Sequence, residues 1–170
     1  MLFRSERYLC SSSDPEGRPL ALDLLKGAYH GRIYNVGRLD FLSSGLIFFT
    51  NDGIFAKKMT HPSGEIEKEY IVETKEPLLE EYLKEFQKGF YFEDSRYKIK
   101  NYKIINTNSA RLVLTEGKNR EIRNFFLVKR LKVKKIHRIR IGNIHLGKLS
   151  AGQFRYLTNK EISVLLRKKI

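Results

Sequence analysis

The chain has no tryptophan and only one cysteine among its 170 residues. A single cysteine, Cys10, cannot form an internal disulfide, so an apolar core has to stabilise the fold and a reducing, cytoplasmic setting is expected. No apolar run reaches the roughly 18 residues of a membrane-spanning helix. The four histidines show no metal-ligand spacing and no cysteine partners; they are His30, His61, His137 and His145. The sequence therefore predicts no membrane span, no disulfide framework and no metal site.

Acidic residues are scarce after residue 100. Residues 1–100 carry a net charge of −1, whereas residues 101–170 carry +15. The segment from Lys118 to Arg140 alone contains ten cations and one acid, Glu121. A solvated basic face is the simplest alternative, but such one-sided charge favours a polyanionic partner. No broad apolar helical face accompanies it, which argues against a membrane surface. The charge distribution therefore favours a nucleic acid, RNA in particular.

The composition, with 41% hydrophobic and 31% charged residues, is that of a globular protein. The length suits one domain, or two small lobes that share a cleft. Strands and helices interleave without regular βαβ units, so the predicted class is α+β with a largely antiparallel sheet. Hydrophobic periodicity and turn residues predict strands at 46–50, 66–73, 97–106, 110–115 and 133–141, and helices at 53–59, 77–86, 119–130 and 159–168.

The most informative segment is GRLDFLSSGLIFFTNDG, from Gly37 to Gly53. A loop that carries Asp40 leads into the apolar run Leu46–Phe49, which predicts a short strand buried on both faces. A carboxylate on a loop beside a rigid strand is a typical position for a catalytic group, and Arg38 could keep it ionised. Alternatively, Asp40 only accepts hydrogen bonds within its own turn, which is the commoner role for such spacing.

This segment closely resembles the GRLD-x-x-(S/T)-SGLLLLTNDG signature of ribosomal RNA pseudouridine synthases of the RsuA/RluB/RluE/RluF family. Three further segments resemble motifs of the same family in the same order: EKEY at Glu67–Tyr70, EGKNREIRNFF at Glu116–Phe126 and KKIHRIRIG at Lys134–Gly142. The resemblance implies a pseudouridine synthase catalytic fold. Such a fold has a mixed, largely antiparallel central sheet with flanking helices, and two lobes around a catalytic cleft.

The resemblance also implies an enzyme that isomerises a specific uridine in ribosomal RNA, with 23S RNA favoured over 16S RNA. The reaction breaks the C1′–N1 bond, turns the uracil and rejoins it through C5. Redox balance is unchanged and no group leaves, so neither a cofactor nor a metal is expected. The base has to be lifted out of its stack. The expected partner is ribosomal RNA, the expected setting is the cytoplasm, and the expected oligomeric state is a monomer.

Family position assigns the catalytic roles. Asp40 is the essential carboxylate, which either attacks C1′ or removes the 2′ proton; the sequence leaves both routes open, and the logic is that of glycoside hydrolases. Arg123 is its counter-ion, and Tyr70 stacks on the target base. Without the resemblance, Arg123 would be read as a phosphate contact or a solvated residue, and Tyr70 as core. The substrate-binding candidates are Arg38, Lys118, Asn119, Arg120, Lys134, Ile136 and Arg138, with Ile136 as an apolar wall.

Further basic residues are candidates for an RNA-backbone track, although any one of them could be merely solvated; they are Arg130, Lys132, Lys135 and Arg140. Asn119 is also predicted to cap the helix at 119–130. The segment Leu2–Tyr8 departs from the family pattern. It reads LFRSERY where relatives have a strand and an N-K-P-x-G turn, so the first strand is expected to be shortened or altered.

The chain is expected to form one catalytic domain over residues 1–170, because it leaves no room for the S4-type RNA-binding domain of most relatives. It would then follow the shorter RluE-like arrangement or be a truncated form. The main alternative is a non-catalytic RNA-binding protein that retains the synthase fold. A small cationic ribosome-associated protein would explain the charge but not the GRLD segment.

Overall fold

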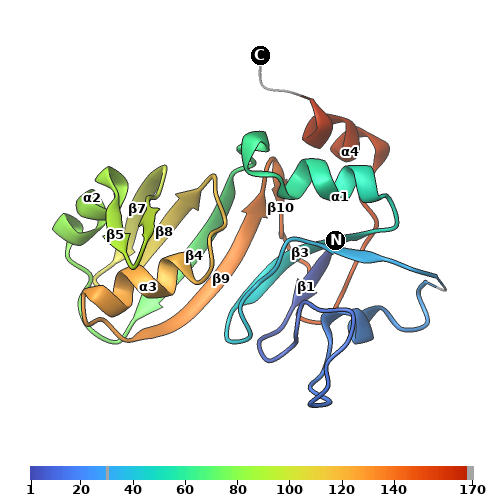
Figure 1. Cartoon of the computed structure of the whole chain (residues 1–170), viewed down its shortest axis with the longest axis horizontal. Coiled ribbons are helices and arrows are strands. Elements are labelled where there is room, and N and C mark those ends of the chain that lie inside the picture. The colour runs from blue at the N-terminus through green and yellow to red at the C-terminus, as the bar shows by residue number, and fades with distance from the viewer. Residues whose placement is uncertain (30, 168–170) are drawn as a thin grey trace.

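The computed structural model describes residues 1–29 and 31–167 (Figure 1). His30 and the last residue of the predicted helix 159–168 lie outside the described residues. The main sheet consists of β1 (Leu2–Arg4), β2 (Tyr34–Val36), β3 (Ser44–Thr50), β4 (Lys68–Thr74), β7 (Asn101–Asn106), β8 (Ser109–Leu114), β9 (Val133–Ile141) and β10 (Ile144–His145). The other elements are the hairpin β5 (Phe90–Phe92) and β6 (Ser95–Tyr97), the α-helices α1 (Gly53–Thr60), α2 (Glu80–Lys88), α3 (Glu121–Val128) and α4 (Asn159–Leu166), and the 3₁₀ helices η1 (Ala21–Leu25) and η2 (Pro62–Gly64).

The strand order β1-β3-β9-β4-β8-β7 gives a mixed sheet, with β2 paired to β3 and β10 paired to β9. Every strand pair of this sheet is antiparallel except β3 with β9, which is parallel. The predicted α+β class with a largely antiparallel sheet is confirmed.

The apolar core divides into two clusters, and the helices α2 and α3 lie at the opposite end of the sheet from α1 and α4 (Figure 1). The first cluster lies under α2 and α3, where the rings of Phe86 and Phe125 stack with centroids 4.1 Å apart. The second lies between the N-terminal strands and the helices α1 and α4. Strand β9 contributes Ile136 to the first cluster and Ile141 to the second. Strand β3 likewise contributes Ile47 to the first cluster and Phe48 to the second, so both strands connect the two lobes expected from the resemblance.

The apolar run after the Asp40 loop forms β3, as predicted. Leu46, Ile47 and Phe48 are at most 1% exposed. Gly45 lies opposite Arg138 of β9 with φ +114°. A Cβ at this position would lie 2.2 Å from the carbonyl oxygen of Arg138, so only glycine lets the two strands come this close. This contact brings the end of the Asp40 loop next to β9.

The first strand is present but short. Strand β1 pairs antiparallel with β3 on one side. On its other side, Phe3 N donates to Gln153 O at 3.0 Å and Gly152 N donates to Phe3 O at 2.9 Å. Arg155 N also donates to Met1 O at 2.9 Å. Strand β1 therefore lies between β3 and residues 152–155, whereas the rest of the departing segment, residues 5–8, lies outside the strand.

Two local predictions were wrong. Asn119 does not cap α3: the N-cap residue is Arg120, in the left-handed conformation at φ 49° and without a side-chain cap bond. The Asn119 carbonyl instead accepts from the side chain of Asn124. The second is the start of the helix predicted at 77–86, where Leu79 is 45% exposed. Helix α2 begins only at Glu80, and Leu79 is its extended N-cap.

Candidate active site

A cavity of about 410 Å³ is lined by residues of both apolar clusters. Its walls come from the loop 36–40, the end of α1, strand β4, the segment 114–122 and strand β9. The cavity brings together seven of the predicted site residues, which are Arg38, Asp40, Tyr70, Lys118, Arg120, Ile136 and Arg138. Its volume lies within the range of about 300–1,000 Å³ that is typical of small-molecule sites.

Asp40 lies at the cavity with Arg123 of α3 beside it. The Nε atom of Arg123 is 3.4 Å from Oδ2 of Asp40, and the Asp40 side chain is 32% exposed. Arg123 Nη2 also donates to the Leu42 carbonyl at 2.6 Å and to Ser43 Oγ at 3.4 Å. Burial lowers the pKa of Arg123, and Asp40 acts against this shift; the guanidinium stays charged. The predicted ion pair is present, whereas Arg38 is exposed at the rim.

Tyr70 and Arg138 lie together in the wall of the cavity. Tyr70 is 9% exposed, and the guanidinium carbon of Arg138 lies 5.9 Å from its ring centroid. Arg138 is only 2% exposed. Its Nε donates to the Leu46 carbonyl at 2.7 Å, and its Nη1 donates to the Arg38 carbonyl at 3.3 Å. Arg138 is therefore not an exposed surface cation; it lines the cavity and holds β3 and the Asp40 loop through these carbonyls.

Two titratable residues that the sequence reasoning missed, one half-buried and one buried, hold the loop 115–120. Lys68 lines the cavity, and its Nζ donates to the carbonyls of Ile66, Glu116 and Thr115 at 3.1, 3.4 and 3.5 Å. Burial, followed by the charge of Arg138, lowers the pKa of Lys68 to about 8. In the sequence, the only indication that Lys68 belongs to the site is its place in the EKEY motif.

Glu121 is the second of these residues, and it is 4% exposed. Its two carboxylate oxygens accept from the backbone N–H groups of Lys98 and Lys118, each at 3.3 Å. Burial raises the pKa of Glu121 to about 7, although these two hydrogen bonds act in the opposite direction. The loop that carries Lys118 and Arg120 is thus fixed by Lys68 through its carbonyls and by Glu121 through an amide.

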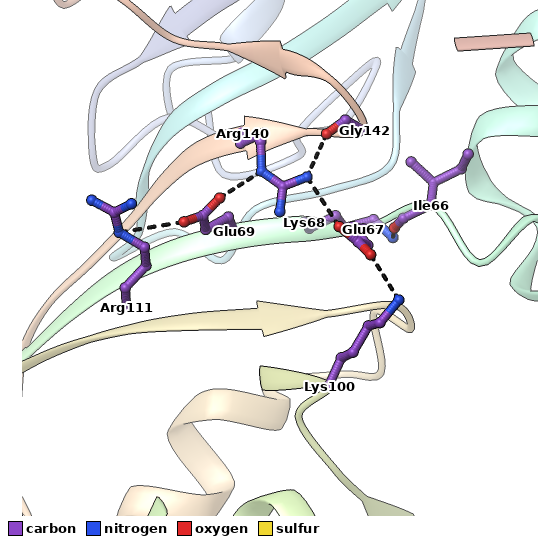
Figure 2. A network of polar contacts seen from close by, with 8 residues as sticks. All are labelled: Ile66, Glu67, Lys68, Glu69, Lys100, Arg111, Arg140 and Gly142. Atoms are coloured by element: carbon purple, nitrogen blue, oxygen red, sulfur yellow. Dashed lines mark hydrogen bonds and ion pairs between the residues drawn. The ribbon is translucent and has the colours of Figure 1, made fainter. Parts of the chain in front are cut away.

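Arg140 was predicted as a backbone-track residue, but it belongs to an ion-pair network across β4 and β9 (Figure 2). Its Nε donates to Glu69 at 2.5 Å, and its Nη1 donates to Glu67 at 3.2 Å. Lys100 and Arg111 bind the same two carboxylates at 2.8 and 3.3 Å. The Arg140 side chain is only 14% exposed. Its predicted role as a phosphate contact is therefore wrong.

The other residues predicted to contact RNA fall into two groups: some line the cavity and others lie outside it. Lys118 and Arg120 are exposed at the cavity. Lys134 and Asn119 do not line it, and Lys134 lies 3.5 Å from Glu73. The predicted track residues Arg130, Lys132 and Lys135 are exposed and do not line the cavity.

Across residues 1–29 and 31–167, no group of three or more His, Cys, Asp or Glu side chains could hold a metal ion. No helix in these ranges is long and apolar enough to span a membrane.

The family model described as RNA pseudouridylate synthase matches residues 5–127. The chain belongs to the RNA pseudouridylate synthase family. It is 48% identical over 164 residues to an uncharacterized RNA pseudouridine synthase of Borreliella burgdorferi, covering 96% of this chain and 66% of that protein. It is 34% identical over 168 residues to ribosomal large subunit pseudouridine synthase B of Pseudomonas aeruginosa, covering 95% of this chain and 44% of that protein.

Solved structures agree with this membership. A crystal structure of a pseudouridylate synthase matches with a TM-score of 0.89 and 28% identity, covering 97% of this chain and 72% of that chain. A Cbf5-Nop10-Gar1 complex matches with a TM-score of 0.56 and 14% identity, which shows a shared fold alone. The chain spans 44% to 66% of the length of the two synthases compared by sequence. The resemblance to pseudouridine synthases and the predicted fold class are confirmed.

Proposed function

We propose that this chain isomerises a uridine of ribosomal RNA to pseudouridine, with Asp40 as the essential carboxylate. The observation that carries the proposal is the partly exposed Asp40 at the cavity, ion-paired with the half-buried Arg123. Arg123 supplies a positive charge beside this carboxylate, and the partial exposure of Asp40 leaves it accessible to a substrate. Tyr70 and Ile136 line the same cavity, which supplies an aromatic and an apolar wall beside that carboxylate.

The proposed reaction uses these groups as follows. The target nucleotide leaves its stack and enters the cavity, where its base lies against Tyr70 and Ile136 keeps water from the sugar. Asp40 either attacks C1′ or removes the 2′ proton, and the C1′–N1 bond breaks. The uracil turns, and a C1′–C5 bond forms while C5 loses its proton and N1 gains one. In the first route the bond between Asp40 and C1′ breaks at this step; in the second route the proton taken from C2′ returns to it. Arg123 pairs with the Asp40 carboxylate and holds the loop that carries it.

The proposed RNA contacts are the exposed cations at the mouth of the cavity, Arg38, Lys118 and Arg120. Such residues position a phosphate backbone without reading its sequence. We propose large-subunit RNA as the substrate, because the relative from Pseudomonas aeruginosa is named a ribosomal large subunit synthase. A substrate of this kind places the enzyme in the cytoplasm, where we propose that it acts as a monomer.

The test combines mapping with one isosteric variant. Pseudouridine is mapped in ribosomal RNA from cells with and without the gene, and in RNA fragments treated with the purified wild type and with Asp40→Asn. One site should depend on the gene, and Asp40→Asn should bind RNA like the wild type but show no turnover. Turnover within about tenfold of the wild type, or about 1.4 kcal/mol in the barrier, would remove Asp40 from the mechanism. Binding without turnover by the wild type would favour the non-catalytic RNA-binding protein.

A further inference from the structure

Arg4 is a buried arginine whose position the catalytic chemistry does not explain. It lies in β1, it is 0% exposed, and it does not line the cavity. Burying a charged group is costly unless hydrogen bonds compensate for the lost water. The hydrogen bonds that Arg4 makes all go to main-chain carbonyls: Nη1 donates to Tyr8, and Nη2 donates to Asp40 at 2.8 Å and to Ser43.

The carbonyls of Asp40 and Ser43 mark the two ends of the turn that presents the proposed catalytic carboxylate. Ser43 N donates to the Asp40 carbonyl at 2.9 Å, which closes the turn 40–43. Arg4 Nη2 joins the same two residues from the side of β1. Arg123 holds the turn from the side of α3, through the Leu42 carbonyl and the Ser43 hydroxyl. Two arginines from distant parts of the chain therefore hold one four-residue turn.

We propose that Arg4 is a positioning residue, which fixes the backbone of the turn 40–43 so that the Asp40 carboxylate points at the substrate sugar. Arginine suits this role because its planar guanidinium offers five donors in a rigid fork, enough for three carbonyls at once. A lysine ammonium would have to reach the same carbonyls from a single nitrogen. The kinetic part of this proposal rests on the proposed function, since it concerns the rate at which Asp40 acts.

The matched comparison is Arg4→Ala against Leu2→Ala. Both side chains are 0% exposed and lie on β1, but Leu2 packs in the apolar core and makes no hydrogen bond to the turn. Both substitutions should lower Tm. At a temperature where both variants are folded, Arg4→Ala should lose about 100-fold in single-turnover rate, because misplacing a catalytic group by about 1 Å costs this much. Its RNA affinity should stay near that of the wild type, and Leu2→Ala should keep its rate.

Chemical rescue separates positioning from general destabilisation. Methylguanidinium at non-denaturing concentration should restore part of the Arg4→Ala rate by occupying the space of the lost guanidinium. It should leave Leu2→Ala unchanged, and NaCl at equal ionic strength should rescue neither variant. The proposal is overturned if Arg4→Ala keeps the wild-type rate, if Leu2→Ala loses as much, or if rescue is the same in both variants. If Arg4→Ala does not fold, Arg4→Lys and Arg4→Gln take its place, with Lys expected to retain more rate than Gln.

Hydrogen exchange keeps this test independent of the proposed function. The Ser43 amide, which donates to the Asp40 carbonyl, should exchange faster in Arg4→Ala and slow again with methylguanidinium. If the wild type forms no pseudouridine but the exchange behaves in this way, the proposed function fails and Arg4 remains the anchor of the turn. If the wild type is active and exchange at Ser43 is unchanged in Arg4→Ala, the positioning role alone is refuted.

Discussion

Replacing Glu121 with glutamine removes a buried carboxyl group whose pKa the fold raises from 4.5 to about 7. The folded protein therefore holds this proton more tightly than the unfolded chain does. The resulting stability is fully present below pH 4.5 and is lost as the pH rises through 7. Between pH 5 and pH 8 the titration of this one group should lower the wild type's free energy of unfolding by about 2–3 kcal/mol, at about 1.4 kcal/mol per pKa unit.

The assay is urea unfolding of the wild type and of Glu121→Gln at pH 5 and pH 8. Burial lowers the pKa of His137, so this group changes stability in the opposite direction, but it is present in both proteins and cancels in their difference. The wild type should lose about 2–3 kcal/mol more than the variant between the two pH values. Glu81→Gln, at an exposed position of α2, should keep the wild-type pH dependence. If the two proteins lost stability in parallel with rising pH, the buried carboxyl would not be the cause.

Three further predictions concern the site and the sheet. Arg123→Ala should reduce the single-turnover rate much more than RNA affinity, since its partner is the proposed catalytic carboxylate; an equal loss in both, measured side by side, would make it an RNA contact. The double variant Lys118→Ala and Arg120→Ala should make the log–log plot of RNA affinity against salt concentration less steep, by about two in slope. The control double variant Lys132→Ala and Lys135→Ala, whose residues lie outside the cavity, should change this slope less. Gly45→Ala should destabilise the fold by more than about 3 kcal/mol in urea unfolding, because its Cβ has no space; a stable variant would contradict the close contact of β3 with β9.

Local sequence signals predict the helices and strands whose formation depends on residues close together in the sequence. Strand β3 follows from an apolar run between turn residues, and α1 begins at Gly53, after the N-cap Asp52, whose side chain accepts from the N–H groups of Ile54 and Phe55. The hairpin β5–β6 was missed: its strands are three residues each, and only Tyr97 falls in the strand predicted at 97–106. The pairing of Asp40 with Arg123 came from the family motif, since 83 residues separate the two in sequence.

The charge of the basic segment does not predict which of its side chains are buried, paired or exposed. A count of cations between Lys118 and Arg140 does not say which of them are buried. Arg140 is neutralised by Glu67 and Glu69 because the β4–β9 register sets Glu69 opposite it. Arg138 turns inward to the carbonyls of β3 and of the Asp40 loop. Both outcomes depend on strand register, which the alternation of residues along β9 does not determine.

The position of β1 between β3 and residues 152–155 has a consequence for the order in which the protein is made. The strand that carries Arg4 is translated well before its second neighbour, residues 152–155. Pairing over such a sequence separation requires a large loop to close, which slows folding. A growing chain that has not reached Gly152 holds β1 by one edge only. The second edge of the strand that anchors the Asp40 turn is therefore covered only after residues 152–155 have been translated.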